Sequence, residues 1–129
     1  MLVQTLNGNC VKWKLEDQVV HTNKSSFHLK TREILKERFP THQILEEVSI
    51  PILPKLNLYL DFFLPLRKLA VEVQGQQHFT FNPFFHKTQA QFRQQLKNDR
   101  IKKEWCDLNN IELLVFSFED EDHWTEILS

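Results

Sequence analysis

The sequence contains little glycine and little cysteine, and both shortages exclude classes of function. Gly8 and Gly75 are the only glycines in 129 residues, too far apart to form a glycine-rich phosphate-binding loop. Cys10 and Cys106 are the only cysteines, which excludes a cysteine-rich zinc module or a disulfide scaffold. The most apolar stretch, 56–66, is far too short to span a membrane. The chain has the length and composition of one ordinary globular domain.

The sequence also has almost no excess of positive or negative residues, since its net charge is only −1. The charges are nevertheless unevenly distributed along the chain. Residues 1–103 contain all 16 Lys and Arg together with nine acids, whereas residues 104–129 contain eight acids and no Lys or Arg. Such asymmetry is typical of a nucleic-acid partner, a membrane surface or an acidic tail. The first residues lack the cationic and apolar segments of a signal peptide, so we expect a cytoplasmic protein with reduced thiols.

Hydrophobic periodicity and turn residues predict the order hairpin, helix, three strands, helix, strand, helix. The expected elements are a hairpin around Asn7-Gly8, a helix to about Phe39, strands at 45–50, 56–64 and 68–74, a helix at 88–108, a strand at 111–118 and a terminal helix. This order predicts an α/β domain with a mixed sheet flanked by helices. We expect one domain, with a hairpin extension at 1–24, a core at 25–118 and an acidic helix at 119–129.

Two carboxylates fall inside apolar strands. An ionised carboxylate in such a strand costs several kcal/mol unless it is paired or binds a metal. Asp61 lies in Leu58-Tyr59-Leu60-Asp61-Phe62-Phe63-Leu64, and Glu72 lies in the next strand, two residues before Gln74. Consecutive strands joined by a short turn pair antiparallel, which can bring Asp61 beside Glu72. Two neighbouring carboxylates repel unless a cation lies between them, and oxygen ligands suit Mg²⁺ or Mn²⁺. The alternative is that one acid pairs with Arg67, Lys68 or a helix lysine, while the other reaches solvent at a strand end.

The order of these residues resembles the PD-(D/E)XK nuclease superfamily, and within it the very-short-patch repair (Vsr-like) endonuclease branch. The likeness covers about residues 25–129 and rests on the segments Val71-Glu72-Val73-Gln74-Gly75-Gln76-Gln77-His78-Phe79, Asn98-Asp99-Arg100-Ile101-Lys102-Lys103-Glu104-Trp105-Cys106 and Asn109-Asn110-Ile111-Glu112-Leu113-Leu114. The resemblance implies a restriction-endonuclease-like fold with the core order αβββαβ.

The resemblance also implies a set of site residues. Asp61, Glu72 and the Val73 carbonyl would be metal ligands, and Glu33 would complete the site through water or a hydrogen bond. His78 and Asp99 match a histidine and a helix aspartate that variant sites of the family use. For Asp99, a surface ion pair with Lys103 is an equally good interpretation.

One departure from the family pattern affects catalysis. Gln74 stands where the motif usually has a lysine, and an amide can hold a water but cannot act as a base. His78 is the favoured general base, because imidazole accepts a proton near neutral pH. Alternatively Lys102 or Lys103 reaches the site from the helix.

We therefore expect a metal-dependent DNA endonuclease, structure-selective rather than strongly sequence-specific, with RNA left open as a substrate. Phosphate contacts are expected from the basic residues of the second helix, namely Lys97, Arg100, Lys102 and Lys103. A catalytically silent DNA-binding or accessory protein on the same fold is the alternative. A homodimer and a basic protein partner for the acidic C-terminus are further expectations; a membrane partner is not.

The remaining histidines and both cysteines are expected to be structural or solvated. The histidines lie in loops or on polar helix faces without metal-ligand spacing, so we expect each to be exposed: His21, His28, His42, His86 and His123. Both cysteines are expected to be small core residues.

Overall fold

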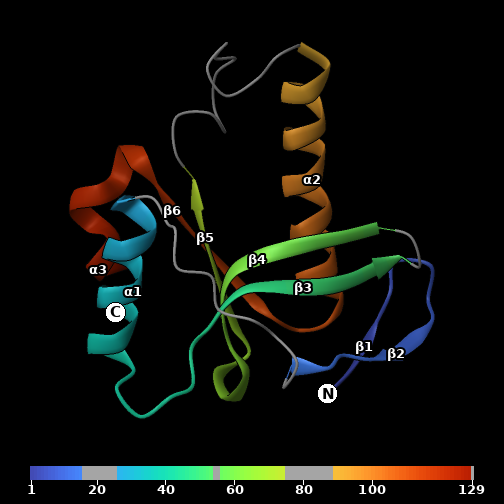
Figure 1. Ribbon diagram of the computed structural model, residues 1–129, viewed down its shortest axis with the longest axis horizontal. Helices are drawn as coiled ribbons and strands as arrows, with labels where there is room; N and C mark the ends of the chain where they lie inside the picture. The colour runs from blue at the N-terminus through green and yellow to red at the C-terminus, as the bar shows by residue number, and fades with distance from the viewer. Residues whose placement is uncertain (16–25, 54–55, 75–88, 129) are drawn as a thin grey trace.

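The computed structural model describes residues 1–15, 26–53, 56–74 and 89–128, and the elements follow the predicted order (Figure 1). The elements are β1 (Leu2–Gln4), β2 (Cys10–Lys12), α1 (Ser26–Arg38), β3 (Leu45–Leu53), β4 (Leu56–Leu64), the 3-10 helix η2 (Pro65–Arg67), β5 (Leu69–Gln74), α2 (Gln89–Leu108), β6 (Glu112–Ser117), the 3-10 helix η4 (Phe118–His123) and α3 (Trp124–Ile127). The predicted α/β class is confirmed.

The main sheet has the strand order β3-β4-β5-β6. β3 with β4 and β4 with β5 pair antiparallel, while β5 and β6 pair parallel, so the predicted mixed sheet is confirmed. The parallel pair requires a crossover, and α2 provides it. The β4–β5 register ends where Phe62 pairs with Val71, next to the two acids. A second sheet contains only β1 and β2.

Each face of the main sheet is covered by a separate apolar cluster, because successive residues of a strand point to opposite faces. On one face, α1 and α3 pack through Leu35 and Trp124 against Phe62 of β4 and Val71 of β5. The other face packs against α2 and the N-terminal hairpin. On β5, Ala70 belongs to the α2 side, whereas Leu69 and Val71 belong to the α1 side.

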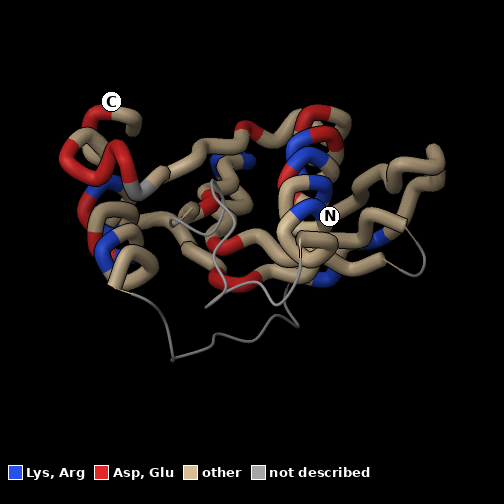
Figure 2. Tube along the Cα trace, turned by 90° about the horizontal axis from the view of Figure 1, so that it is seen from above, with Lys and Arg blue, Asp and Glu red and all other residues tan. Residues whose placement is uncertain are grey.

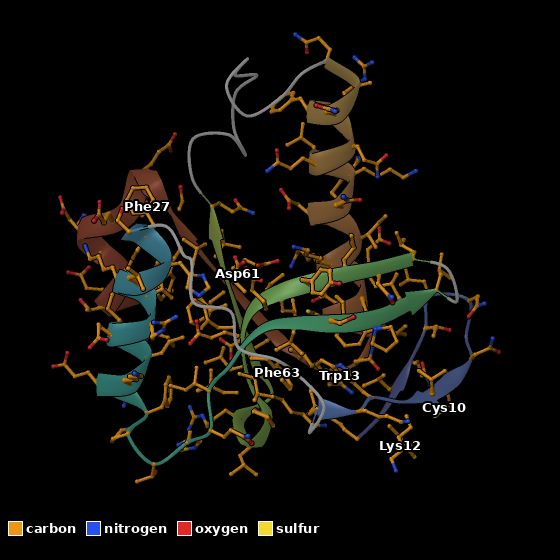
Figure 3. All side chains as sticks on the ribbon, viewed as in Figure 1. Cys10, Lys12, Trp13, Phe27, Asp61 and Phe63 are labelled. Carbon is orange, nitrogen blue, oxygen red and sulfur yellow. The ribbon has the colours of Figure 1, made fainter. Side chains whose placement is uncertain are left out.

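The N-terminal hairpin is joined to the core through one tryptophan. Trp13 is buried, its indole N–H donates to the carbonyl of Ser49 at 2.8 Å, and its ring lies 4.7 Å from Phe63 and 5.2 Å edge-on from Trp105. Figure 3 shows Trp13 and Phe63 beside each other. The turn at Asn7-Gly8 uses a positive φ at Gly8, as the sequence predicts. The hairpin thus completes one face of the core.

Helix α2 is buried only near its C-terminus. Trp105 and Cys106 are its two buried residues, and burial raises the pKa of the Cys106 thiol to about 12, so this cysteine is an inert core residue as predicted. The same prediction is wrong for Cys10, which is exposed on the two-stranded sheet. The N-terminal turns of α2 extend beyond the strands (Figure 1). No described helix is long and apolar enough to cross a membrane.

The acidic C-terminal segment differs from the single helix that was predicted. Residues 118–123 form a 3-10 helix, with a non-helical Asp120 inside it, and only 124–127 are α-helical. The indole of Trp124 anchors this segment by donating to the carbonyl of Ser117 at 2.8 Å. Lys30 of α1 lies 3.1 Å from the Glu121 carboxylate, so part of the acidic charge is paired within the molecule.

Candidate functional site

Asp61 and Glu72 lie together at the point where β4 and β5 separate. The main-chain N–H of Asp61 donates to Oε2 of Glu72 at 3.1 Å, and the N–H of Val73 donates to Oδ2 of Asp61 at 2.8 Å. Each carboxylate therefore accepts from the backbone of the opposite strand, in place of the ladder bonds that would continue the pairing. The predicted proximity of the two acids follows from this exchange, and Figure 3 shows Asp61 between β5 and α2.

The environment of the pair disfavours two negative charges. Burial raises the pKa of Asp61 well above its usual value, and the neighbouring Glu72 carboxylate raises it further. The Val73 N–H and the charge of Lys102 oppose this shift only in part. A bound proton or a nearby cation therefore relieves the repulsion between Asp61 and Glu72.

Lys102 supplies such a cation from α2. Its Nζ lies 2.7 Å from Oε1 of Glu72, with only 17% of the lysine side chain exposed. Burial works against the lysine charge, but the Glu72 carboxylate outweighs it and the net pKa of Lys102 is raised. Oε1 is buried and accepts no well-aligned hydrogen bond, so the contact is chiefly electrostatic. Of the two lysines considered, Lys102 is the one that reaches the acids, whereas Lys103 is 68% exposed and lies 3.7 Å from Asp107.

A third acid stands in the same row across the sheet. The β3–β4 register pairs Glu46 with Phe62 and Val48 with Leu60, which places Glu47 opposite Asp61. Glu47 has a φ of 48°, a left-handed conformation that is uncommon for a residue other than glycine. The sequence interpretation missed Glu47, because its position depends on the strand register. Its signal was the acidic pair 46–47 in a strand expected to lie beside Asp61.

Two grooves run along α2, one on each side of the carboxylate pair. The groove over β5 and β6 has a volume of about 230 Å³ and is lined by Glu72, Gln74, Asp99, Arg100, Lys102, Lys103, Leu113 and Val115. The groove over β3 and β4 has a volume of about 310 Å³ and is lined by Glu47, Leu58, Tyr59, Asp61, Gln95, Asn98, Asp99 and Lys102. Asp99 and Lys102 line both, so α2 forms the shared wall between them.

The remaining predicted site residues are distributed as follows. Gln74 lies on the same face of β5 as Glu72 and lines the first groove with it. Asp99 lines both grooves from α2. Glu33 is exposed on α1, on the opposite face of the sheet from α2, and it lines neither groove. His78 lies outside the described residues.

The expected phosphate contacts lie on one helix. Arg100, Lys102 and Lys103 line the groove over β5 and β6, while Lys97 is exposed one turn earlier on α2. Figure 2 shows basic residues along α2, and acidic residues of the C-terminal segment near α1. Three of the four expected phosphate contacts therefore line the same groove as Glu72.

A separate buried ionic network on the α1 side was not predicted. Arg32 donates from Nε and Nη2 to the two carboxylate oxygens of Glu46 at 2.9 and 2.8 Å, and His28 Nε2 lies 2.7 Å from Oε1. Burial opposes the Glu46 charge, but the Arg32 and His28 hydrogen bonds outweigh it and lower the pKa of Glu46. His28 is buried and stacks on Phe62, so its predicted exposure is wrong. Its i,i+4 spacing from Arg32 was the available signal.

The donor set fits a hard divalent cation as far as the structure describes it. Mg²⁺ is commonly held by one or two carboxylates, with waters and substrate phosphates completing its coordination. Asp61 and Glu72 provide such a pair, and Oε1 of Glu72, which contacts the Lys102 ammonium at 2.7 Å, would have to exchange that contact for the metal. Among the described residues, no group of three or more His, Cys, Asp or Glu is arranged to hold a metal. A metal would therefore depend on two carboxylates, a carbonyl and water.

Comparison with known proteins gives relatives without a described activity. The chain is 39% identical over 66 residues to "Uncharacterized protein 307L" of Invertebrate iridescent virus 6, covering 51% of this chain and 34% of the relative. It is 38% identical over 58 residues to "Uncharacterized protein 033L" of Invertebrate iridescent virus 3, covering 45% of this chain and 30% of the relative. The matched part is thus about a third of each relative. No family model and no solved structure matches the chain.

Proposed function

We propose that the chain is a metal-dependent nuclease of the restriction-endonuclease-like fold, which hydrolyses phosphodiester bonds in DNA and selects its substrate by structure. The observation that carries this proposal is the Asp61–Glu72 pair, fixed at the fork between two strands and faced by Lys102. A perturbed acid beside a charged partner in a groove is typical of a catalytic site, although structural ion pairs share this signature.

The roles follow from the chemistry of each side chain. Asp61, Glu72 and the Val73 carbonyl would hold Mg²⁺ or Mn²⁺, which supplies a water of lowered pKa and positive charge near the phosphate. Gln74 lies on the Glu72 face of β5, where its amide can orient a water without taking its proton. Asp99 faces the same groove from α2 and can accept a hydrogen bond from that water. His78 stays the proposed general base.

Lys102 replaces the motif lysine in this proposal. The sequence has glutamine at position 74, while the Lys102 ammonium reaches Glu72 from α2. A cation held beside the carboxylates can turn to a phosphate oxygen once substrate is bound, and it stabilises the negative charge of the transition state. The charge is thus brought to the same groove from a helix instead of a strand.

A cleavage panel tests the proposal. Supercoiled plasmid, duplex, nicked, flap and branched DNA, with an RNA duplex, are incubated with the chain in Mg²⁺, Mn²⁺ or EDTA. We expect metal-dependent cleavage that prefers one of the non-duplex structures. Asp61→Asn and Glu72→Gln should each reduce the rate at least about a hundredfold, the scale of losing one preorganised electrostatic contact.

The matched controls are conservative changes outside both grooves. Glu37→Gln alters an exposed acid of α1, and Asp107→Asn an exposed acid of α2. Both should cleave at the wild-type rate. Equal cleavage by wild type and both site variants, in every metal, would show that the activity does not come from Asp61 and Glu72.

The silent DNA-binding module is the second candidate, and one observation favours it. Lys102 already supplies a positive charge 2.7 Å from Glu72, so the pair is neutralised in part without a metal. Titration calorimetry with Mn²⁺ separates the two candidates. Stoichiometric binding that Asp61→Asn abolishes supports the nuclease, whereas DNA binding without any heat of Mn²⁺ binding supports the silent module.

A further inference from the structure

The two grooves along α2 differ in charge, although Asp99 and Lys102 line both. The groove over β5 and β6 is lined by three cationic side chains, Arg100, Lys102 and Lys103, against the two carboxylates of Glu72 and Asp99. The groove over β3 and β4 is lined by one cation, Lys102, against the three carboxylates of Glu47, Asp61 and Asp99. A phosphate backbone is attracted to the first groove and repelled from the second. The second groove therefore favours an uncharged or cationic group over an anion.

The second groove also has the side chains that recognise a flat, uncharged, hydrogen-bonding group. Tyr59 lines this groove with 54% of its surface exposed, so its ring is accessible to a ligand. Tyr59 and Asp61 are two residues apart, so they share a face of β4. From α2, Gln95 and Asn98 add two carboxamides to the opposite wall. An aromatic face beside amides and carboxylates complements a nucleobase, whose amino groups donate and whose ring stacks.

The position of the groove restricts the form of the nucleic acid. Asp61 lines this groove and Glu72 lines the groove over β5 and β6. The carboxylate pair therefore lies between the groove that attracts phosphates and the groove that contains Tyr59. A base in a duplex is stacked on both faces and cannot present one to Tyr59. Only an unpaired or extruded base can enter while its phosphate stays at the acids.

We propose that the groove lined by Tyr59, Gln95 and Asn98 binds one unpaired nucleobase of the strand whose phosphate lies at Asp61 and Glu72. Tyr59 stacks on the base, and the amides and carboxylates contact its edge. This inference rests on the proposed nuclease function and identifies the substrate as DNA with a single-stranded or distorted segment.

The test measures binding without cleavage. Oligonucleotides carrying 2-aminopurine at one position are titrated with the chain in EDTA, as a single strand, as a flap and as a blunt duplex. We expect stacking on Tyr59 to quench 2-aminopurine in the single strand and the flap, but not in the duplex. Tyr59→Leu should remove the quench and weaken single-strand binding by at least about fivefold. Tyr59→Phe should preserve both.

The control is Leu66→Ala, which alters an 82% exposed apolar residue of η2 that lines neither groove. It should quench like wild type. Equal quenching by wild type and Tyr59→Leu, or equal binding of single strand and duplex, overturns the base site. Metal-dependent cleavage that persists in Tyr59→Leu with unchanged structure preference would overturn this inference alone. Quenching without any cleavage by the wild type would leave the base site standing and overturn the nuclease.

Discussion

At the scale of single residues, Asp61 has the environment that most opposes its own charge. It sits beside Glu72, and the raised pKa means that the folded chain binds its proton more tightly than the unfolded chain does. Stability therefore falls as the pH rises from the usual aspartate value of 3.8 through the raised folded pKa. Such a built-in destabilisation is typical of functional sites, where activity is retained at the expense of stability.

The first prediction concerns Asp61→Asn. The amide oxygen can still accept from the Val73 N–H, while the repulsion with Glu72 disappears. At pH 7 we expect the variant to be more stable than wild type by about 1 kcal/mol, and to be inactive. The difference should vanish as the pH falls towards 4. Urea unfolding across this pH range checks it, with Asp107→Asn as the control. A variant less stable than wild type at pH 7 would contradict the inference that the Asp61 charge destabilises the fold.

The second prediction compares two adjacent lysines of α2. Lys102→Met leaves the buried Glu72 carboxylate without its cation and should destabilise the fold by about 1–3 kcal/mol. Lys103→Met removes only an exposed contact and should stay within about 0.5 kcal/mol of wild type. In Lys102→Met combined with Glu72→Gln, most of the loss should be recovered, because no charge is left unpaired. Additive losses in the double variant would mean that the two groups do not interact.

At the scale of elements, α1 is attached to β3 by the Arg32–Glu46–His28 network. The lowered pKa of Glu46 means that its contribution to stability is present above the usual glutamate value of 4.5, and is lost as the pH falls through the folded pKa. This behaviour is opposite to that of Asp61, and it places an acid-sensitive contact between a helix and the edge strand of the sheet.

The third prediction follows from this contact. Glu46→Gln retains a carbonyl acceptor but loses the bidentate ion pair, so it should destabilise the fold by about 2 kcal/mol at pH 7. The loss should shrink as the pH falls from the usual glutamate value of 4.5 through the lowered folded pKa of Glu46, where Glu46 itself becomes protonated. Denaturation at pH 3.5 and pH 7 measures both values, and Glu37→Gln, an exposed acid of α1, serves as the control. A pH-independent loss would show that Glu46 stabilises the fold through its packing and not through its charge.

The fourth prediction concerns the N-terminal hairpin. The hairpin supplies Trp13 to the same apolar cluster as Trp105 of α2. Trp13→Ala should therefore destabilise the whole chain by about 3–5 kcal/mol, in the range of other large-to-small core substitutions. Leu2→Ala, at a 73% exposed site on β1, should change stability by less than about 0.5 kcal/mol. Thermal unfolding followed by tryptophan fluorescence compares them; an unaffected Trp13→Ala would mark the hairpin as a separable extension.

At the scale of the whole molecule, the sequence predicts the element order well because each element has a local signal. Pro40 follows α1, Gly75 follows β5, and the apolar runs of the strands have the expected length. The Asp61–Glu72 contact could also be predicted, since two consecutive strands joined by a short turn pair antiparallel. The position of Glu47, the burial of His28 and the choice of Lys102 over Lys103 were not predicted. The local signals, such as the acidic pair 46–47, do not fix them, because each depends on register or helix rotation between elements distant in sequence.

The net charge of −1 belongs to the same scale, and it conceals where DNA would bind. Acidic residues of the C-terminal segment are partly paired with α1, through Lys30 and Glu121, whereas α2 presents its basic residues beside the carboxylate pair (Figure 2). Local phosphate contacts, and not the sum of all charges, set the salt dependence of binding.

The fifth prediction is therefore a salt dependence that maps to one helix. A plot of the logarithm of the DNA-binding constant against the logarithm of salt concentration should have a negative slope, which Lys97→Ala and Arg100→Ala each reduce by about one. Lys36→Ala removes an exposed lysine from α1, on the other face of the sheet, and should leave the slope unchanged. Fluorescence anisotropy in EDTA measures these slopes without cleavage. If Lys36→Ala reduces the slope as much as Arg100→Ala, DNA contacts basic residues on both faces of the sheet. The proposed binding of DNA along α2 would then be wrong.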